Sequence, residues 1–301
     1  MVTIYDPLTN QTIEYSIDKK LIKIWDKLKD GKLAELNEDR VYLVDGRERV
    51  GKSSWAFQQA KYIDPYFNVD RICFKPDDFL NQIRTAPKGA VVVFDEAFRG
   101  LSSKATRSTV NKKIVEALME VGQRNLVIFI VLPTLFLLEI YAAVFRSEAL
   151  FHIYKSRKTK SDIKKQRAFK IYNYEKKKQL YLRGKTKHFS YALPKIFKQK
   201  GRFFVKNGKP YDTFDIDAYL KKKDEAFKSS EEVVEKEEKT NRRSEAFEKI
   251  IYKMSSVDNL PVNEINKRLL EMGIEYSNES IQKIVEKRRR IGNSSSNPLS
   301  N

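Results

Sequence analysis

The sequence has very few residues of the types that build disulfide frameworks and zinc centres. Its 301 residues include one cysteine, Cys73, and two histidines, His152 and His188. One cysteine cannot form an internal disulfide, and so few His and Cys side chains show no spacing typical of a zinc site or a histidine-based triad. The first residues also lack a basic segment followed by an apolar run, so no secretory signal is expected. We therefore expect a cytoplasmic protein.

Long apolar runs are also scarce. Residues 126–145 are the candidate for a membrane span, because these twenty residues carry one charge, Glu139. Pro133 lies in the middle of the run, and the β-branched stretch 127–131 is typical of a buried parallel strand. We therefore expect a strand followed by a helix here, and no integral membrane span.

Charge is the most uneven feature of the chain. Lys and Arg number 59 against 40 Asp and Glu, a net charge of +19, which indicates a polyanionic partner such as nucleic acid or an anionic membrane surface. Residues 151–200 alone contain 17 Lys and Arg and two acidic residues. Such density favours contacts with a phosphate backbone, although a charged strand face can also be merely solvated. The candidate DNA-binding residues are Lys164, Lys165, Arg167, Lys176, Lys177 and Lys178.

Apolar strands alternate with helices over the first 155 residues. Strands are expected at 41–45, 70–74, 90–94, 126–132 and 150–155, and helices at 52–63, 111–122 and 135–147. Strands that are apolar on both faces imply a mostly parallel sheet with helices on each side. Two alternating runs within 167–184 predict a β-hairpin in the basic region.

A glycine-rich loop joins the first of these strands to the first helix. It reads Gly46-Arg47-Glu48-Arg49-Val50-Gly51-Lys52-Ser53 and matches the pattern GxxxxGK[ST]. In such loops glycines allow the tight turn, backbone N–H groups hold phosphate oxygens, the lysine reaches the β/γ-phosphates and the hydroxyl ligates Mg²⁺. A chance glycine turn is the alternative, but the flanking strand and helix favour a site for ATP and Mg²⁺. The predicted nucleotide-binding residues are Gly46, Arg47, Glu48, Arg49, Val50, Gly51, Lys52, Ser53 and Ser54.

Two carboxylates follow the strand at 90–94. Asp95 is suited to hold Mg²⁺, and Glu96 to orient or deprotonate the attacking water. Ligands of open α/β sheets bind at the carboxyl ends of the strands, which is where this pair is expected. A turn or helix cap is the structural alternative.

The loop and the Asp-Glu pair together resemble the Walker A and Walker B boxes of P-loop NTPases of the additional-strand (ASCE) type. The resemblance implies an extra strand between the boxes, which is expected at 70–74. Arg124 before the strand at 126–132, Pro133-Thr134 after it and a helix ending at Arg146 resemble the corresponding part of the FtsK/HerA-like DNA-pumping ATPases. Zonula occludens toxin-like proteins of phages and mobile elements share this resemblance, which covers residues 40–155.

The resemblance also implies a sensor and an arginine finger. Thr134 takes the position of the γ-phosphate sensor, where the family has Gln. Arg124 and Arg146 are candidate fingers that would complete the site of a neighbouring subunit. The alternatives are a cation at a helix C-terminus for Arg124 and a surface or ion-paired residue for Arg146.

Three short helices are expected near the C-terminus, at 242–254, 261–272 and 278–290. The second and third resemble a helix-turn-helix, whose last helix would enter a major groove with Lys287, Arg288, Arg289 and Arg290. A three-helix oligomerisation or docking unit is the alternative.

The sequence thus predicts six segments and one leading function. The segments are an N-terminal extension (1–40), a P-loop ATPase core (41–157), a basic, partly β region (158–225), a charged linker helix (226–241), the helix-turn-helix-like module (242–290) and a disordered tail (291–301). The leading function is a Mg²⁺-dependent ATPase acting on DNA as an oligomeric motor or loader of a virus or mobile element. A nucleotide-dependent DNA-binding switch and a membrane-associated assembly ATPase are the alternatives.

Overall fold

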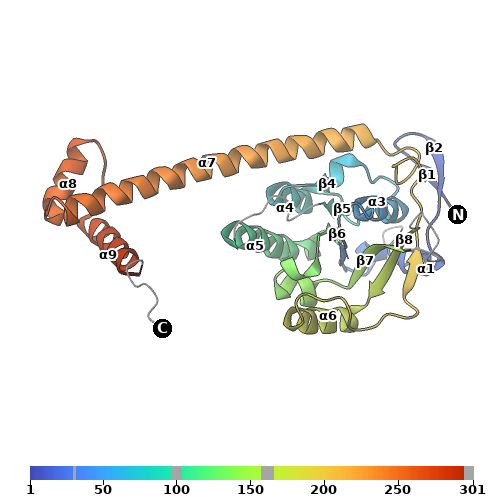
Figure 1. The fold of residues 1–301 in the computed structure, drawn as a ribbon. Helices are drawn as coiled ribbons and strands as arrows, with labels where there is room; N and C mark the ends of the chain where they lie inside the picture. Colours follow the sequence, from blue (N-terminus) through green and yellow to red (C-terminus); the bar gives the residue numbers. More distant parts are fainter. Residues whose placement is uncertain (30–31, 96–103, 157–165, 295–301) are drawn as a thin grey trace. The chain divides into compact units, whose positions relative to one another are not determined.

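The computed structural model describes residues 1–29, 32–95, 104–156 and 166–294, and contact clustering divides the chain into two compact units, Met1–Asp224 and Glu225–Asn301. The first unit is built on a seven-stranded sheet in the order β4-β5-β6-β3-β7-β8-β9 (Figure 1). Its strands are β3 (Arg40–Asp45), β4 (Ile72–Cys73), β5 (Val91–Phe94), β6 (Val127–Val131), β7 (Ala149–Ser156), β8 (Gln166–Tyr172) and β9 (Lys200–Arg202).

The five strands β4, β5, β6, β3 and β7 are parallel to one another. Strands β8 and β9 follow β7 at one side of the sheet and are paired antiparallel. Strand β6 lies between β3, which carries the glycine-rich loop, and β5, which carries Asp95. An inserted strand at this place defines the additional-strand P-loop NTPase fold. The predicted fold class, a mostly parallel α/β sheet with further C-terminal helices, is therefore confirmed. The prediction of residues 70–74 for the inserted strand is wrong, because β4 lies at the edge of the sheet.

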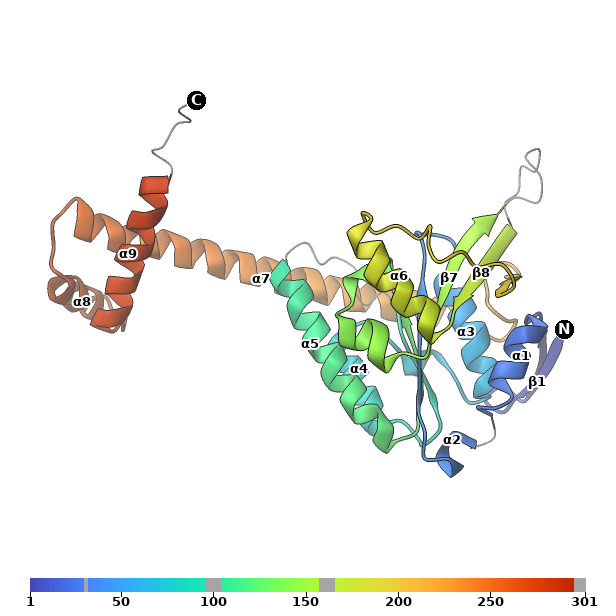
Figure 2. The ribbon, with the colours of Figure 1, turned by 90° about the horizontal axis from the view of Figure 1, so that it is seen from below.

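Side chains along β3 alternate between two helical layers, as the period of a strand requires. Val41 and Leu43 belong to the core beneath α4 (Pro76–Thr85), α5 (Lys104–Glu120) and α6 (Tyr174–Thr186). Tyr42 points to the other face, where its ring lies 5.1 Å from Trp25 of α1 (Lys19–Trp25). Helix α3 (Lys52–Ile63) covers the same face through Trp55, and Figure 2 shows both layers.

The N-terminal residues form a hairpin, β1 (Val2–Asp6) and β2 (Gln11–Tyr15), followed by α1 and the short α2 (Lys32–Glu35). A buried ion pair of 2.9 Å joins Asp6 to Lys61 of α3. Burial opposes ionisation of Asp6, but hydrogen bonds from Lys61, Thr213 and the Leu8 amide leave its pKa lowered. The hairpin is thereby fixed to the helix that follows the glycine-rich loop.

The segment after β6 departs from the predicted helix at 135–147. It forms a 3-10 turn, η3 (Leu135–Leu137), and a π-helical turn, η4 (Tyr141–Arg146). Asn111 takes two backbone groups that a continuous helix would pair, since it accepts from the Glu139 amide and donates to the Leu137 carbonyl. Asp45 accepts from the Leu135 amide at the start of the segment. Tertiary hydrogen bonds therefore override the local helical pattern.

The predicted second hairpin strand is wrong. Residues Tyr174–Thr186 form α6, which begins at Asn173, whose side chain accepts from the Lys176 amide. Strand β8 pairs instead with β7 and with β9. Burial of Leu180 and Tyr181 against the core favours the helix.

Helix α7 (Ile216–Ser256) begins in the first unit and continues into the second, where α8 (Val262–Glu271) and α9 (Asn278–Ser294) follow. The second unit has its own small core of Ile251, Ile265, Leu269, Ile281 and Val285. Further short turns are η1 (Val69–Arg71) and η2 (Val121–Gln123). Within the described ranges, no helix has the length and apolar character needed to cross a membrane.

Candidate nucleotide-binding site

The loop between β3 and α3 has backbone angles that require its glycines. Gly46 has φ +141°, and a Cβ placed on it would lie 2.1 Å from the carbonyl oxygen of Ile153. Gly51 has φ +97° and forms the N-cap of α3, and Arg49 between them also has a positive φ of 56°. The loop therefore turns back tightly and presents the N-terminus of α3, which is the end of a helix that attracts anions.

Three polar side chains meet at this loop, namely Lys52, Ser53 and Asp95. Lys52 Nζ donates to the carbonyl oxygens of Gly46 and Arg47 at 2.7 and 3.0 Å. Ser53 Oγ donates to Asp95 Oδ1 at 2.9 Å, and the Asp95 side chain is fully buried. The fold thus joins the end of β5 to the start of α3, which lie 42 residues apart in the sequence.

A pocket of about 610 Å³ opens beside these groups. One wall is the loop, a second is the end of β6, and the third comes from residues 210–223, which sequence reasoning had not connected with the site. The lining residues are Glu48, Arg49, Gly51, Lys52, Ser53, Ser54, Phe57, Val131, Leu132, Pro133, Pro210, Phe214, Ile216, Tyr219 and Lys223. Of the other predicted nucleotide-binding residues, Val50 is buried, and Arg47 and Gly46 contact Lys52 through their carbonyl groups.

A buried polar network centred on Asp45 supports the start of the loop. Asp45 Oδ1 lies 2.8 Å from His152 Nδ1, and Oδ2 accepts from the Leu135 amide at 2.9 Å and from the hydroxyl of Tyr191. Burial, together with the neighbouring Asp45 carboxylate, raises the pKa of Tyr191 well above its usual value, so the hydroxyl stays a donor. In the sequence, the one signal of this network is the position of Asp45 at the end of a strand, directly before Gly46.

Thr134 belongs to that network and not to the pocket wall. Its hydroxyl lies 2.8 Å from the hydroxyl of Tyr191 and caps the turn at Phe136. Pro133 lines the pocket in its place. The prediction of Thr134 as γ-phosphate sensor is therefore not supported by its orientation, because its oxygen is used for local structure.

The two candidate arginine fingers lie at the opposite edge of the sheet. Arg124 ends η2 just before the start of β6, and its carbonyl accepts from the Gly89 amide. Arg146 is ion-paired with Asp39 and donates from Nε to the Leu118 carbonyl at 3.0 Å. The ion-paired alternative thus describes Arg146, and neither arginine lines the pocket of its own chain.

The basic candidates that the structure describes are placed differently from one another. Lys177 is fully buried and donates to the carbonyls of Val144 and Ser147, and burial lowers its pKa to about 7. Its assignment to DNA binding is therefore wrong. Lys176 and Lys178 are partly exposed on the same helix.

Arg167 lies against the glycine-rich loop. Its Nε and Cδ come within 3.0 and 3.1 Å of the position of a Cβ on Gly51. Nε is buried and has no hydrogen-bond partner among the described residues. This location differs from the open nucleic-acid surface that the sequence predicted for Arg167.

On α9, Lys287 and Arg288 bind the Glu248 carboxylate at 2.9 and 3.2 Å, whereas Arg289 and Arg290 have exposed side chains. These two bonds help to hold α9 against the end of α7. Glu96, Lys164 and Lys165 lie outside the described residues, so their assignments stay predictions.

Comparisons with known proteins give only distant similarities. No protein-family model matches the chain, and no curated protein matches it. Among solved structures, the chain is similar to the N-terminal domain of zonular occludens toxin from Neisseria meningitidis, with 15% identity, a TM-score of 0.34, and coverage of 56% of this chain and 96% of that one.

Two further structures show similarity of the same order. A KaiC-like protein from Pyrococcus horikoshii OT3 has 14% identity and a TM-score of 0.33, over 46% of this chain and 80% of that one. The ATPase DotB from Legionella pneumophila has 11% identity and a TM-score of 0.30, over 56% of this chain and 55% of that one, about half of its length. The strand order and the glycine-rich loop show that the first unit has the additional-strand P-loop NTPase fold.

Proposed function

We propose that this protein is a Mg²⁺-dependent ATPase that acts on DNA, as an oligomeric motor or loader of a virus or mobile element. The observation that carries the proposal is the hydrogen bond from Ser53 to Asp95 beside the ammonium group of Lys52. A hydroxyl, a carboxylate and a lysine in this arrangement are the groups that bind a nucleotide phosphate together with its metal ion.

The residues present suit a magnesium ion. Mg²⁺ prefers oxygen ligands and keeps several waters. The hydroxyl of Ser53 lines the pocket, and the buried carboxylate of Asp95 lies directly behind it at 2.9 Å. These two residues would hold the ion. When bound, it supplies positive charge to the β- and γ-phosphate oxygens.

The chain's own groups bind and orient the triphosphate. The backbone N–H groups of the loop and the N-terminus of α3 face the phosphates, and Lys52 exchanges the carbonyls of Gly46 and Arg47 for phosphate oxygens. Glu96 follows Asp95 directly in the sequence, and its proposed role is to orient the attacking water.

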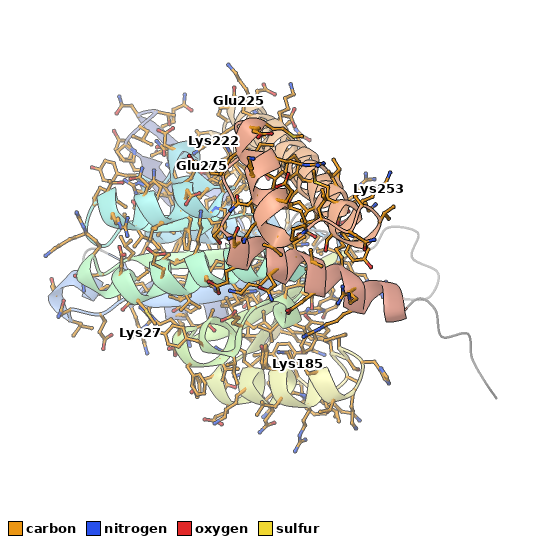
Figure 3. All side chains as sticks on the ribbon, turned by 90° about the vertical axis from the view of Figure 1, so that its left-hand side faces the viewer. Lys27, Lys185, Lys222, Glu225, Lys253 and Glu275 are labelled. Atoms are coloured by element: carbon orange, nitrogen blue, oxygen red, sulfur yellow. The ribbon has the colours of Figure 1, made fainter. Side chains whose placement is uncertain are left out.

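Exposed cations support a nucleic-acid partner. Around the C-terminal half of α6, Arg183, Lys185 and Lys187 are exposed, and Figure 3 marks Lys185 on this helix. In the second unit Arg289 and Arg290 are exposed near the end of α9. Cations of this kind bind phosphate backbones with strong dependence on salt concentration.

The test is ATP hydrolysis by the purified protein without DNA, with duplex DNA and with single-stranded DNA. We expect DNA to raise turnover several-fold, and the Lys52→Ala and Glu96→Gln variants to lose turnover in all three conditions. Lys27→Ala is the matched control, because Lys27 is exposed and does not line the nucleotide pocket. Salt should weaken the stimulation if the contacts are to phosphates.

The same assay separates the proposal from its alternatives. Nucleotide binding without DNA-stimulated turnover would overturn the motor and favour a DNA-binding switch, for which the separate core of the second unit provides a module. Sedimentation with anionic vesicles, combined with no response to DNA, would favour a membrane-associated assembly ATPase.

A further inference from the structure

The first two turns of α7 present one face to the nucleotide pocket. Ile216, Tyr219 and Lys223 all line it, and their spacing of three and four residues places them in one stripe of a helix. All three residues belong to the first unit, which ends at Asp224. The P-loop pocket therefore has a wall contributed by a segment more than 160 residues beyond the loop in sequence.

This segment is fixed firmly to the ATPase core. The ring of Tyr219 is 6% exposed and lies 5.3 Å from Phe57 of α3 and 5.7 Å from Phe74. Lys222 Nζ donates to the carbonyl oxygens of Val69 and Asp70, each at 3.0 Å. The position of Lys223 is thus set by neighbours that hold the helix from two sides.

A short series of hydrogen bonds connects Lys223 to the proposed metal ligands. Lys223 Nζ donates to the hydroxyl of Tyr219 at 3.2 Å, and that hydroxyl donates to Asp95 Oδ2 at 2.8 Å. The other carboxylate oxygen of Asp95 accepts from Ser53 at 2.9 Å. The ammonium group therefore lies on the side of the pocket where the metal ion and the terminal phosphates of a nucleotide would meet.

We propose that Lys223 binds the terminal phosphate of a nucleoside triphosphate in its own subunit, so that the start of α7 distinguishes a triphosphate from a diphosphate. The inference rests on the proposed function. Lys52 belongs to the loop and can bind any nucleotide that has a β-phosphate, whereas Lys223 reaches the pocket from the wall formed by α7. A contact made to one ligand and not to the other is what a nucleotide-dependent response of α7 requires.

The experiment measures the affinity of the full-length protein for a non-hydrolysable β,γ-imido ATP analogue and for ADP, each with Mg²⁺. The variants are Lys223→Met, the conservative Lys223→Arg, and Lys221→Met as the matched control. Lys221 is exposed on the same helix and does not line the pocket. Lys52→Ala reports whether binding uses the loop.

We expect Lys223→Met to weaken the triphosphate analogue about 10- to 100-fold, the range for one lost charged hydrogen bond, and to change ADP affinity by less than about 3-fold. Lys223→Arg should recover most of the loss, and Lys221→Met should match the wild type. An unchanged ADP affinity also shows that the variant is folded.

Two results overturn the inference alone. Equal weakening of both nucleotides by Lys223→Met would give Lys223 a structural role, and unchanged affinity for both would remove it from the site. The proposed function fails if the wild type binds neither nucleotide, or if the Lys52→Ala variant binds both nucleotides as tightly as the wild type does. This inference then fails with it.

Discussion

Replacing Asp45 tests whether its buried network stabilises the first unit. The carboxylate accepts hydrogen bonds from Leu135, Tyr191 and His152, and it has no solvent exposure. Asp45→Ala leaves a buried donor, the Leu135 amide, and two part-buried donors, Tyr191 and His152, without this acceptor. Each unmade bond costs about 1–3 kcal/mol when the donor is buried. We therefore expect the free energy of unfolding to fall by roughly 3 kcal/mol or more, a large part of the stability of a domain.

Asp45→Asn provides the conservative comparison. Its carbonyl oxygen can accept from Leu135 and Tyr191, and its amide group can face a His152 ring nitrogen in the accepting tautomer. We expect this variant to lose only about 1 kcal/mol. Asn keeps the hydrogen bonds but removes the negative charge, whereas Ala removes both. The difference between the unfolding free energies of the two variants therefore reports on the hydrogen bonds.

Urea unfolding followed by tryptophan fluorescence is the appropriate assay. Trp25 and Trp55 are both fully buried in the first unit, so the signal reports on that unit and not on the C-terminal helices. Asp77→Ala is the control, because Asp77 is 71% exposed and its pair with Lys113 should contribute less than about 1 kcal/mol. A loss below about 1 kcal/mol for Asp45→Ala, or an equal loss for Asp45→Asn, would refute the reasoning.

Three further predictions follow from buried groups. Burial lowers the pKa of Lys177 from 10.5 to about 7, so the unfolded chain binds more protons than the folded chain between these two pH values. The free energy of unfolding should therefore rise with pH in this range, by at most about 1.4 kcal/mol per pH unit. Measurements at pH 7 and 9 should show a smaller rise for Lys177→Met. Gly46→Ala should abolish Mg²⁺-nucleotide binding, since its Cβ would lie 2.1 Å from the Ile153 carbonyl, and retained affinity in a binding titration would contradict the loop geometry. Lys61→Met should destabilise the core by about 3–5 kcal/mol in urea unfolding, because it leaves Asp6 charged and buried, and the loss should shrink in the double variant Lys61→Met/Asp6→Leu.

The helices and strands that could be predicted are those with a strong local pattern. Helix α3 occupies residues 52–63, as the glycine-rich loop and the following periodicity predict, and β3, β5, β6 and β7 lie within a residue or two of the apolar runs. Neighbouring residues mark these elements, because glycine conformations and β-branched runs are local signals, although each strand pairs with strands distant in the sequence.

The segments that were predicted wrongly depend on distant partners. Asp45 and Asn111 take the backbone groups of residues 135–139, so a helical pattern there yields two short turns. Lys177 belongs to a run of three lysines, yet it is buried while its neighbours are partly exposed. Composition shows charge, but it does not show which face of a helix the core will cover.

The sequence by itself determined the glycine-rich loop, the strand that ends directly before Asp95 and the alternation of strands and helices. Only the tertiary structure decided which side chains surround that loop: Tyr191 meets Asp45 across 146 residues, and Tyr219 meets Asp95 across 124. The physical reason is the range of the interactions. Backbone conformation and apolar periodicity act between near neighbours, whereas the walls of the pocket are made by packing and hydrogen bonds between segments that the sheet order brings together.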